Sequence, residues 1–218
     1  MNLLQQLYGV FLNREEAGKL LSARLECLKD SNPVILGLPR GGVIIAHQIA
    51  KRLKAELDVV VVRKLRAPES PELAIGAVTE TGATQLNQDV IQALQVSEKY
   101  LRLEEEAQRR QLRARADTYR KVRERVPLTG RVVVLTDDGV ATGATMKAAI
   151  YGVRAENPGR LILAIPVGEL STLEELRNQV DQMLVLERPS FFGGVGLFYQ
   201  DFSQVDEDRV INILKKYA

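Results

Sequence analysis

Short runs of apolar residues alternate with helical segments along most of this chain, and this alternation constrains the fold more than any other feature. The runs are rich in Val, Ile and Leu at consecutive positions, as expected of parallel strands buried on both faces of a sheet. Parallel strands also require long crossover connections, which are right-handed and usually helical. The pattern therefore predicts an α/β fold with a doubly wound parallel sheet. The predicted strands cover residues 34–38, 57–62, 131–136, 161–167 and 183–186.

Helical periodicity fills the connections between these runs. The first helix is expected to begin after the N-cap residue Asn13 and to end near Asp30. Further helices are expected at residues 43–53, 142–156 and 173–178, and from about Val205 onward. Sheets of this kind bind ligands at the carboxyl ends of their strands.

One long stretch departs from this alternation. Residues 63–72, RKLRAPESPE, contain two prolines and predict a mobile loop. The short runs 75–78 and 84–86 flank Thr-Glu-Thr-Gly and predict a small hairpin. Residues 87–126 are helical and charged, and residues 97–125 hold ten Lys or Arg and six Asp or Glu, a net charge of +4. Glu and Arg spaced three and four apart favour a solvated helix with internal ion pairs over a nucleic-acid surface.

Composition excludes several classes of protein. The 30 Lys and Arg residues are nearly balanced by 28 Asp and Glu, so the net charge of +2 does not indicate nucleic-acid binding. No apolar run approaches the roughly 18 residues of a membrane span, and the N-terminal sequence lacks a basic region followed by an apolar stretch. We therefore expect a cytoplasmic protein.

Cysteine and histidine each occur once, as Cys27 and His47. This excludes an intramolecular disulfide, a thiolate metal cluster and a multi-histidine zinc site, and a catalytic triad would need this one imidazole. We expect Cys27 to be buried as a small apolar side chain and His47 to pack against or cap a helix. Any chemistry must then come from glycines, carboxylates, hydroxyls, Lys and Arg.

We expect the 218 residues to form a single domain, because no linker long enough to divide two domains is present. Residues 34–86 and 131–187 would supply the core sheet and its helices. Residues 87–126 would form a charged helical insertion, and residues 1–30 and 188–218 the terminal helices.

The segment VVVLTDDGVATGAT, residues 132–145, carries the chemistry. An apolar strand ends in the carboxylates Asp137 and Asp138, which could accept hydrogen bonds from vicinal hydroxyls or hold Mg²⁺. The loop that follows consists of small residues, which let an anion approach the backbone N–H groups at a helix N-terminus. A phosphate site is therefore predicted at Ala141, Thr142, Gly143, Ala144 and Thr145.

The stretch DDGVATGAT resembles the 5-phosphoribosyl-1-pyrophosphate (PRPP) motif of the type I phosphoribosyltransferases. That motif joins two acidic residues, two mostly apolar ones and a Thr-Gly-x-Thr loop, whereas neither Walker A nor the dinucleotide pattern G-x-G-x-x-G fits. GLPRGGV, VRKLRAPESPELAIGAV and FFGGVGLFYQDF are similar to bacterial phosphoribosyltransferases of unassigned substrate. The resemblance implies the type I phosphoribosyltransferase fold, with residues 188–218 contributing a small C-terminal hood.

The resemblance also implies a PRPP site in three parts. Residues 141–145 would bind the 5′-phosphate, and Asp137 and Asp138 would bind the ribose. Mg²⁺ would be held mainly through PRPP, with these two aspartates as possible further ligands. Pyrophosphate would be bound by Pro39, Arg40, Gly41 and Gly42 after the first strand and by Arg63 and Lys64 after the second. The expected catalytic residues are Asp137, Asp138, Arg40 and Lys64.

The implied reaction breaks the C1–O bond of PRPP through an oxocarbenium-like state, and a nucleophile, commonly a ring nitrogen of a base, attacks with inversion. The two aspartates would oppose the developing positive charge, while Arg40 and Lys64 would neutralise the departing pyrophosphate. Residues 66–73, hinged by Pro68 and Pro71, would act as a lid against water.

The acceptor is not named by the resemblance. In the 6-oxopurine branch of the family an Asp thought to act as general base occupies the position of Ala141, so we do not expect hypoxanthine-guanine activity and identify no proton acceptor. The hood supplies Phe191, Phe192 and Phe198, which could stack on a planar base or could pack to close the sheet edge.

These observations predict a Mg²⁺-dependent glycosyltransferase of nucleotide metabolism. It would transfer the 5-phosphoribosyl group of PRPP to a nitrogenous base or related acceptor, release pyrophosphate and form a homodimer, as is common in the family. Two alternatives stay open. One is a non-catalytic PRPP-sensing regulator that binds RNA, for which the Arg-rich residues 109–125 are available, or a protein partner. The other is a Rossmann-like nucleotide-binding enzyme without phosphoribosyl chemistry.

Overall fold

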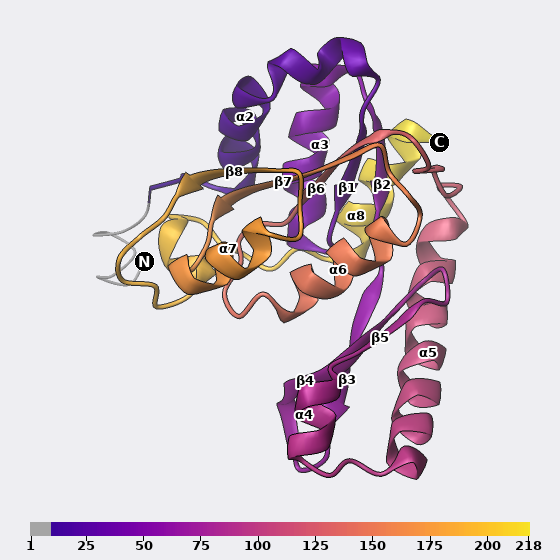
Figure 1. The fold of residues 1–218 in the computed structure, drawn as a ribbon. Coiled ribbons are helices and arrows are strands. Elements are labelled where there is room, and N and C mark those ends of the chain that lie inside the picture. The colour runs from indigo at the N-terminus through magenta and orange to yellow at the C-terminus, as the bar shows by residue number, and fades with distance from the viewer. Residues whose placement is uncertain (1–9) are drawn as a thin grey trace.

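A computed structural model of the chain describes residues 10–218, apart from the side chains of Pro71 and Glu72. The first nine residues, which belong to the predicted terminal segment 1–30, lie outside the described residues. Figure 1 shows a layered body from which an arm projects. The body is built on a five-stranded sheet and the arm on a three-stranded sheet.

The central sheet is parallel throughout, which confirms the predicted α/β fold class. Consecutive residues are buried along four of these strands, as in all four positions of the strand that begins at Val34, whereas the edge strand at residues 182–187 is only partly buried. Across the sheet the strands follow the order β2 (Glu56–Val59), β1 (Val34–Gly37), β6 (Val132–Thr136), β7 (Arg160–Val167) and β8 (Gln182–Glu187).

Helices cover both faces of this sheet, and their distribution creates a reversal point. α2 (Arg14–Arg24), α3 (Gly41–Leu53) and α8 (Glu207–Leu214) share one core cluster, while α6 (Ala144–Arg154) and α7 (Leu170–Arg177) share the other. The chain leaves β1 toward the first face and leaves the neighbouring β6 toward the second. Ligands of doubly wound sheets bind where the order reverses in this way.

The arm begins shortly after β2. β3 (Val62–Ala67), β4 (Ser70–Thr79) and β5 (Thr84–Leu86) form an antiparallel sheet, and α4 (Gln88–Ala93) and α5 (Glu98–Arg120) complete the arm. In Figure 1, α5 runs beside this sheet from the tip of the arm back toward the body. The predicted hairpin around Thr-Glu-Thr-Gly is present as the turn between β4 and β5.

Two predictions for the arm are wrong. The apolar run 57–62 is not one strand, because β2 ends at Val59 and Val62 already belongs to the other sheet. The predicted mobile loop 63–72 is instead most of β3 and the start of β4, so the proposed lid, residues 66–73, is the tip of a hairpin.

The polar sequence of β3 explains the second error. Only Leu65 and Ala67 of the strand are buried, and they join the core cluster that contains Leu112 and Ala116 of α5. Strand pairing and contact with a helix that follows much later in the sequence therefore decide the conformation of this segment, and two alternating apolar residues are too weak a signal to reveal it.

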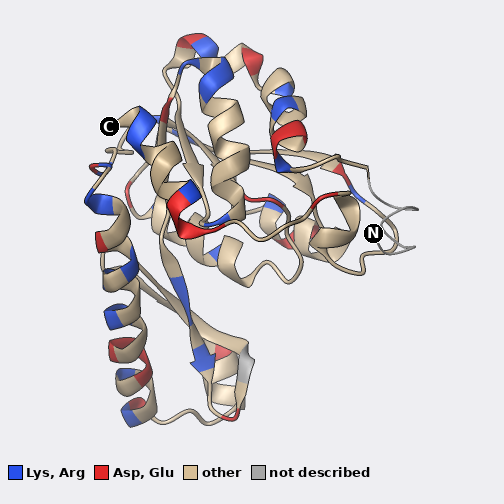
Figure 2. Cartoon of the chain, turned by 180° about the vertical axis from the view of Figure 1, so that it is seen from behind, with Lys and Arg blue, Asp and Glu red and all other residues tan. Residues whose placement is uncertain are grey.

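Acidic and basic residues are interspersed along α5, as Figure 2 shows. Arg102 pairs with Glu98 and Arg109 with Glu105, each one helical turn apart, which agrees with the predicted solvated helix with internal ion pairs. Within residues 10–218, no helix combines the length and the apolar character needed to cross a membrane.

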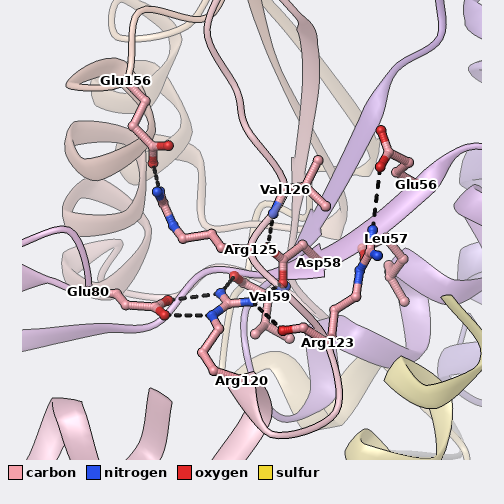
Figure 3. A network of polar contacts seen from close by, with 10 residues as sticks. All are labelled: Glu56, Leu57, Asp58, Val59, Glu80, Arg120, Arg123, Arg125, Val126 and Glu156. Atoms are coloured by element: carbon pink, nitrogen blue, oxygen red, sulfur yellow. Dashed lines mark hydrogen bonds and ion pairs between the residues drawn. The ribbon is translucent and has the colours of Figure 1, made fainter. Parts of the chain in front are cut away.

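A network of largely buried charges joins the arm to the body (Figure 3). Arg120, at the end of α5, donates to Oδ1 of Asp58 in β2 at 2.7 Å and to both carboxylate oxygens of Glu80 at 2.6 and 2.9 Å. Asp58 also accepts hydrogen bonds from the backbone N–H groups of Val59, at 2.7 Å, and Val126, at 3.1 Å. The root of the arm is thus fixed by paired charges.

The burial predicted for Cys27 is wrong, whereas the packing predicted for His47 is confirmed. Cys27 is exposed rather than buried, because α2 ends at Arg24 and the cysteine falls in the 3-10 turn that follows. His47 packs as expected. Its Nδ1 lies 2.8 Å from the hydroxyl of Tyr217, and the two rings meet edge to face.

Candidate active site

The two loops singled out from the sequence lie side by side at the reversal point of the sheet. Gly37, the last residue of β1, pairs in register with Thr136, the last residue of β6. The N–H of Leu38 donates to the carbonyl of Thr136 at 3.0 Å, which holds the loops together just beyond the strands. Residues 38–42 and 137–145 therefore meet at one point of the carboxyl edge.

Gly41 and Gly42 bring the first loop against the acidic pair. A Cβ atom at Gly41 would lie 1.9 Å from Oδ2 of Asp138, and one at Gly42 would lie 2.8 Å from Oδ1 of Asp137. Any larger residue at either position would displace a carboxylate, so this close approach requires glycine. The preceding peptide, Pro39–Arg40, is cis.

The carboxyl pKa values of Asp137 and Asp138 are raised above the ordinary range. Burial is the main cause at both residues, and the charge of Asp138 raises the pKa of Asp137 further. At Asp137 the shift is opposed by the N–H of Asp138, then by the guanidinium of Arg14 and the N–H of Gly42, and at Asp138 it is opposed by Arg14. Within residues 10–218, Arg14 is the one cation ion-paired with this pair, so hydroxyl donors from a ligand would relieve uncompensated negative charge.

Arg14 is anchored on three sides. Its Nε donates to Oδ2 of Asp138 at 2.7 Å and its Nη1 to the carbonyl of Ser203 at 2.9 Å. The guanidinium also lies 3.8 Å from the ring centroid of Phe202, a cation–π contact. Tyr199 completes the connection, because its hydroxyl donates to the carbonyl of Asp138 at 2.6 Å. The N-terminal helix, the acidic pair and the C-terminal segment therefore form one unit.

The second loop has the geometry expected of a phosphate site. Gly143, immediately before α6, has φ of 71° and caps the helix without a side-chain hydrogen bond. The first N–H groups of α6 therefore have no side-chain capping partner there, and Thr142 and Thr145 are exposed beside them. The loop is fixed from behind, because Thr172 of α7 donates to the carbonyl of Ala141 at 2.7 Å.

Glu169 is a carboxylate beside this loop, and its environment makes it a weak base. Its N–H donates to the carbonyl of Val140 at 3.0 Å. Its side chain accepts hydrogen bonds from the hydroxyl of Ser171 and the N–H of Thr172, which lower its pKa to about 2. Glu169 is therefore too weak a base to take the role of the aspartate that the 6-oxopurine branch has at the position of Ala141.

The predicted basic pair, Arg63 and Lys64, lies in β3 of the arm. They are adjacent residues of β3, so their side chains leave opposite faces of the strand. Arg63 donates through Nε to the side-chain oxygen of Gln108 on α5, at 2.7 Å. Of the pair, Arg63 is thus committed to the inside of the arm.

The three hood phenylalanines have different environments. Phe198 is 3% exposed and belongs to the core, and Phe192 stacks on it with ring centroids 5.6 Å apart. Phe191 is 57% exposed. Phe198 thus packs as a core residue, whereas Phe191 is more than half exposed.

The side chains at the site allow a direct assessment of metal binding. Within the described residues, no group of three or more His, Cys, Asp or Glu side chains is arranged to hold an ion. Asp137 and Asp138 supply hard oxygen donors of the type Mg²⁺ prefers, although Oδ2 of Asp138 already accepts from Arg14. The site therefore fits an ion whose ligands come mostly from a bound substrate.

Arg14 was not singled out from the sequence, although one signal was available. Its position in the first helical turn, directly after the N-cap Asn13, places a cation at the positive end of the helix dipole. A positive charge at this end of a helix is unfavourable unless an anion lies beside it, and Asp138, 124 residues later, supplies that negative charge.

Comparison with known proteins identifies relatives across nearly the whole chain. A family model described as "Phosphoribosyl transferase domain" matches residues 12–202. "Putative phosphoribosyl transferase Rv0571c" of Mycobacterium tuberculosis (strain ATCC 25618 / H37Rv) is 42% identical over 207 residues, as is "Putative phosphoribosyl transferase MT0597" of strain CDC 1551. Each match covers 95% of this chain and 47% of the relative, so the chain spans about half the length of these curated relatives.

A solved structure resembles the chain throughout. The crystal structure of the protein TT1426 from Thermus thermophilus is 44% identical, with a TM-score of 0.87. The match covers 95% of this chain and 99% of that one, so the arm and the body occur together in both proteins.

Proposed function

The chain belongs to the phosphoribosyl transferase domain family, and on that premise we propose that it transfers the 5-phosphoribosyl group of PRPP to a nitrogenous base or related acceptor. The observation that carries the proposal is the meeting of two loops at the reversal point of the sheet. The loop of residues 137–145 carries the partly neutralised carboxylates Asp137 and Asp138 and leads into α6, whose N-terminus has no side-chain cap. The loop of residues 38–42 carries Arg40 beside two glycines. We propose that the chain acts as a single phosphoribosyltransferase domain.

Each part of PRPP has a matching set of groups in this proposal. The 5′-phosphate binds at residues 141–145, where α6 begins without a side-chain cap and two threonines are exposed. The ribose hydroxyls donate to Asp137 and Asp138, and the pyrophosphate binds along residues 39–42, with Lys64 as a further cation.

The reaction proceeds by substitution at C1 of the ribose. The C1–O bond breaks and its electron pair leaves with pyrophosphate, while a nitrogen lone pair of the acceptor forms the new bond on the opposite face. Asp137 and Asp138, held in place by Gly42 and Arg14, stabilise the positive charge that develops on the ribose. The raised pKa values of the pair indicate a poorly solvated environment, in which such charge stabilisation is strong.

Mg²⁺ is part of the proposal. It would bind through PRPP oxygens and retained waters, with Asp137 and Asp138 as the protein groups able to contact it. When bound, it would neutralise charge on the pyrophosphate and hold it for departure.

The acceptor pocket is proposed at the C-terminal hood. Phe191 offers an exposed ring on which a planar acceptor could stack. The proton lost from the acceptor nitrogen would pass to solvent or to another group close to the bound acceptor. Ala141 has no side chain that could act as a base, and the pKa of Glu169 is too low.

A panel of acceptors tests the proposal. The protein is incubated with PRPP, Mg²⁺ and individual purines, pyrimidines and aromatic carboxylates, and pyrophosphate release is followed together with the mass of any new nucleotide. Release that depends on one acceptor supports transfer. Tight PRPP binding without turnover, together with salt-sensitive RNA binding, would instead favour the regulator. Sedimentation at several concentrations tests the proposed homodimer.

A further inference from the structure

A cavity of about 340 Å³ lies between residues 40–41, in the loop proposed to bind pyrophosphate, and residues 202–205 near the C-terminus. Its lining residues are Arg14, Arg40, Gly41, Phe202, Gln204 and Val205. Two arginines from the starts of different helices thus border one space, and none of these six residues carries a negative charge. The chemistry of the lining suits an anion.

Arg14 is pre-organised toward this space. Its Nε and Nη1 are committed to Asp138 and to the carbonyl of Ser203, and Phe202 supports the face of the guanidinium. Its Nη2 has no hydrogen-bond partner within residues 10–218 and remains available to a ligand. A side chain already held in one orientation loses little entropy when it binds.

Arg14 also supplies the positive charge that was expected from Arg63 on the basis of the sequence. Arg63 was expected to be a second arginine for pyrophosphate, but it donates to Gln108 inside the arm. Arg14 borders the same cavity as Arg40 and Gly41, which belong to the loop assigned to pyrophosphate.

We propose that Arg14 is a second pyrophosphate-binding residue, which acts with Arg40 across this cavity while it holds Asp138 in place. The inference rests on the proposed function and adds to it a residue outside the recognised motifs. It also gives a reason for a cation in the first turn of α2 and for its contact with Phe202.

The test compares variants in which the carboxylate partner is already removed. Arg14→Gln alone would leave a buried, unpaired Asp138, so Asp138→Asn is compared with the double variant Arg14→Gln/Asp138→Asn. The binding of inorganic pyrophosphate and of ribose 5-phosphate is measured by calorimetry with Mg²⁺ present. We expect the double variant to bind pyrophosphate at least about tenfold more weakly than Asp138→Asn, the loss typical of one charge-assisted hydrogen bond, and to bind ribose 5-phosphate within about threefold.

Two further variants complete the design. Arg14→Lys keeps the charge but loses the planar fork, and we expect it to retain part of the pyrophosphate affinity. Arg52→Gln removes an arginine from an exposed ion pair with Glu26 and should leave both affinities unchanged.

Equal pyrophosphate affinity of the single and the double variant would overturn the inference, because Arg14 would then act only through Asp138. An equal loss for both ligands would overturn it as well. If wild-type protein transferred nothing from PRPP to any acceptor but still bound pyrophosphate in an Arg14-dependent way, the proposed function would fail and the inference about this cavity would stand.

Discussion

Asp58 is a buried carboxylate on β2, and Asp137 and Asp138 are partly buried carboxylates just beyond β6; β2 and β6 flank β1, yet the surroundings of these carboxylates differ. Burial raises the carboxyl pKa at all three residues, although neighbouring arginines oppose the shift. Asp58 is satisfied by two backbone N–H groups and by Arg120. Asp137 accepts a hydrogen bond from the N–H of Asp138 at 2.9 Å, and within residues 10–218 Arg14 is the one cation ion-paired with the acidic pair.

The comparison shows that a raised carboxyl pKa does not by itself identify a binding site. Asp58 belongs to a saturated network that fixes the arm to the body (Figure 3). Asp137 and Asp138 retain capacity to accept hydrogen bonds where two loops meet. The number of unused acceptor positions, together with the place in the sheet, separates a structural carboxylate from a binding one.

Removal of Arg120 should produce the largest effect. Arg120→Met would leave Asp58 and Glu80 largely buried without their cation, and we expect a loss of about 3–5 kcal/mol in the free energy of unfolding. Urea denaturation measures this loss. The triple variant Arg120→Met/Asp58→Asn/Glu80→Gln should recover much of it, and a single-variant loss below about 1 kcal/mol would contradict the assigned role.

Removal of both site carboxylates should abolish PRPP binding without unfolding the protein. In Asp137→Asn/Asp138→Asn the ribose hydroxyls lose their anionic acceptors, and we expect affinity for PRPP to fall by at least about 100-fold, since hydrogen bonds to charged groups contribute about 1.5–3 kcal/mol each. Calorimetry in the presence of Mg²⁺ measures the change. Unchanged affinity would rule out the pair as the ribose site.

The same substitution should stabilise the protein more at Asp137 than at Asp58. Asp137 has a folded-state pKa above its unfolded value, so its ionised form destabilises the folded protein at neutral and higher pH. Asp137→Asn should therefore stabilise the protein by about 1 kcal/mol at pH 8, and the gain should shrink as pH falls through the folded-state pKa toward the unfolded value near 3.9. Asp58→Asn should stabilise less, because the raised pKa of Asp58 also favours a neutral side chain but Arg120 loses a hydrogen-bond partner.

Thermal and urea unfolding at pH 8 and at pH 5 measure these differences. A gain from Asp137→Asn at pH 8 no larger than that from Asp58→Asn would show that the acidic pair is as well satisfied as Asp58 and would remove the contrast between them.

The smallest effect is expected at a matched arginine on the same helix as Arg120. Arg102 pairs with Glu98 at 3.4 Å, but the two side chains are 70% and 89% exposed. Arg102→Ala should change the free energy of unfolding by less than about 0.5 kcal/mol, because solvent screens exposed pairs. A loss comparable to that of Arg120→Met would mean that α5 as a whole, rather than its buried terminus, fixes the arm.

Much of the fold was accessible from local pattern. The inner strands of the central sheet appear as apolar runs because both of their faces are buried, and Asn13 caps α2 as its side chain predicts. The arm was misread, because β3 is polar at most positions and owes its conformation to pairing with β4 and contact with α5.

The sequence alone determined which residues form the strand, the acidic pair and the small-residue loop at 132–145, because strand burial, charge and backbone freedom are local properties. Only the tertiary structure decided what surrounds them. It brought Gly41 within reach of Asp138, directed Arg63 into the arm and brought Arg14 from the start of the chain to the acidic pair. Such contacts depend on where distant elements pack, and no spacing within a single segment records them.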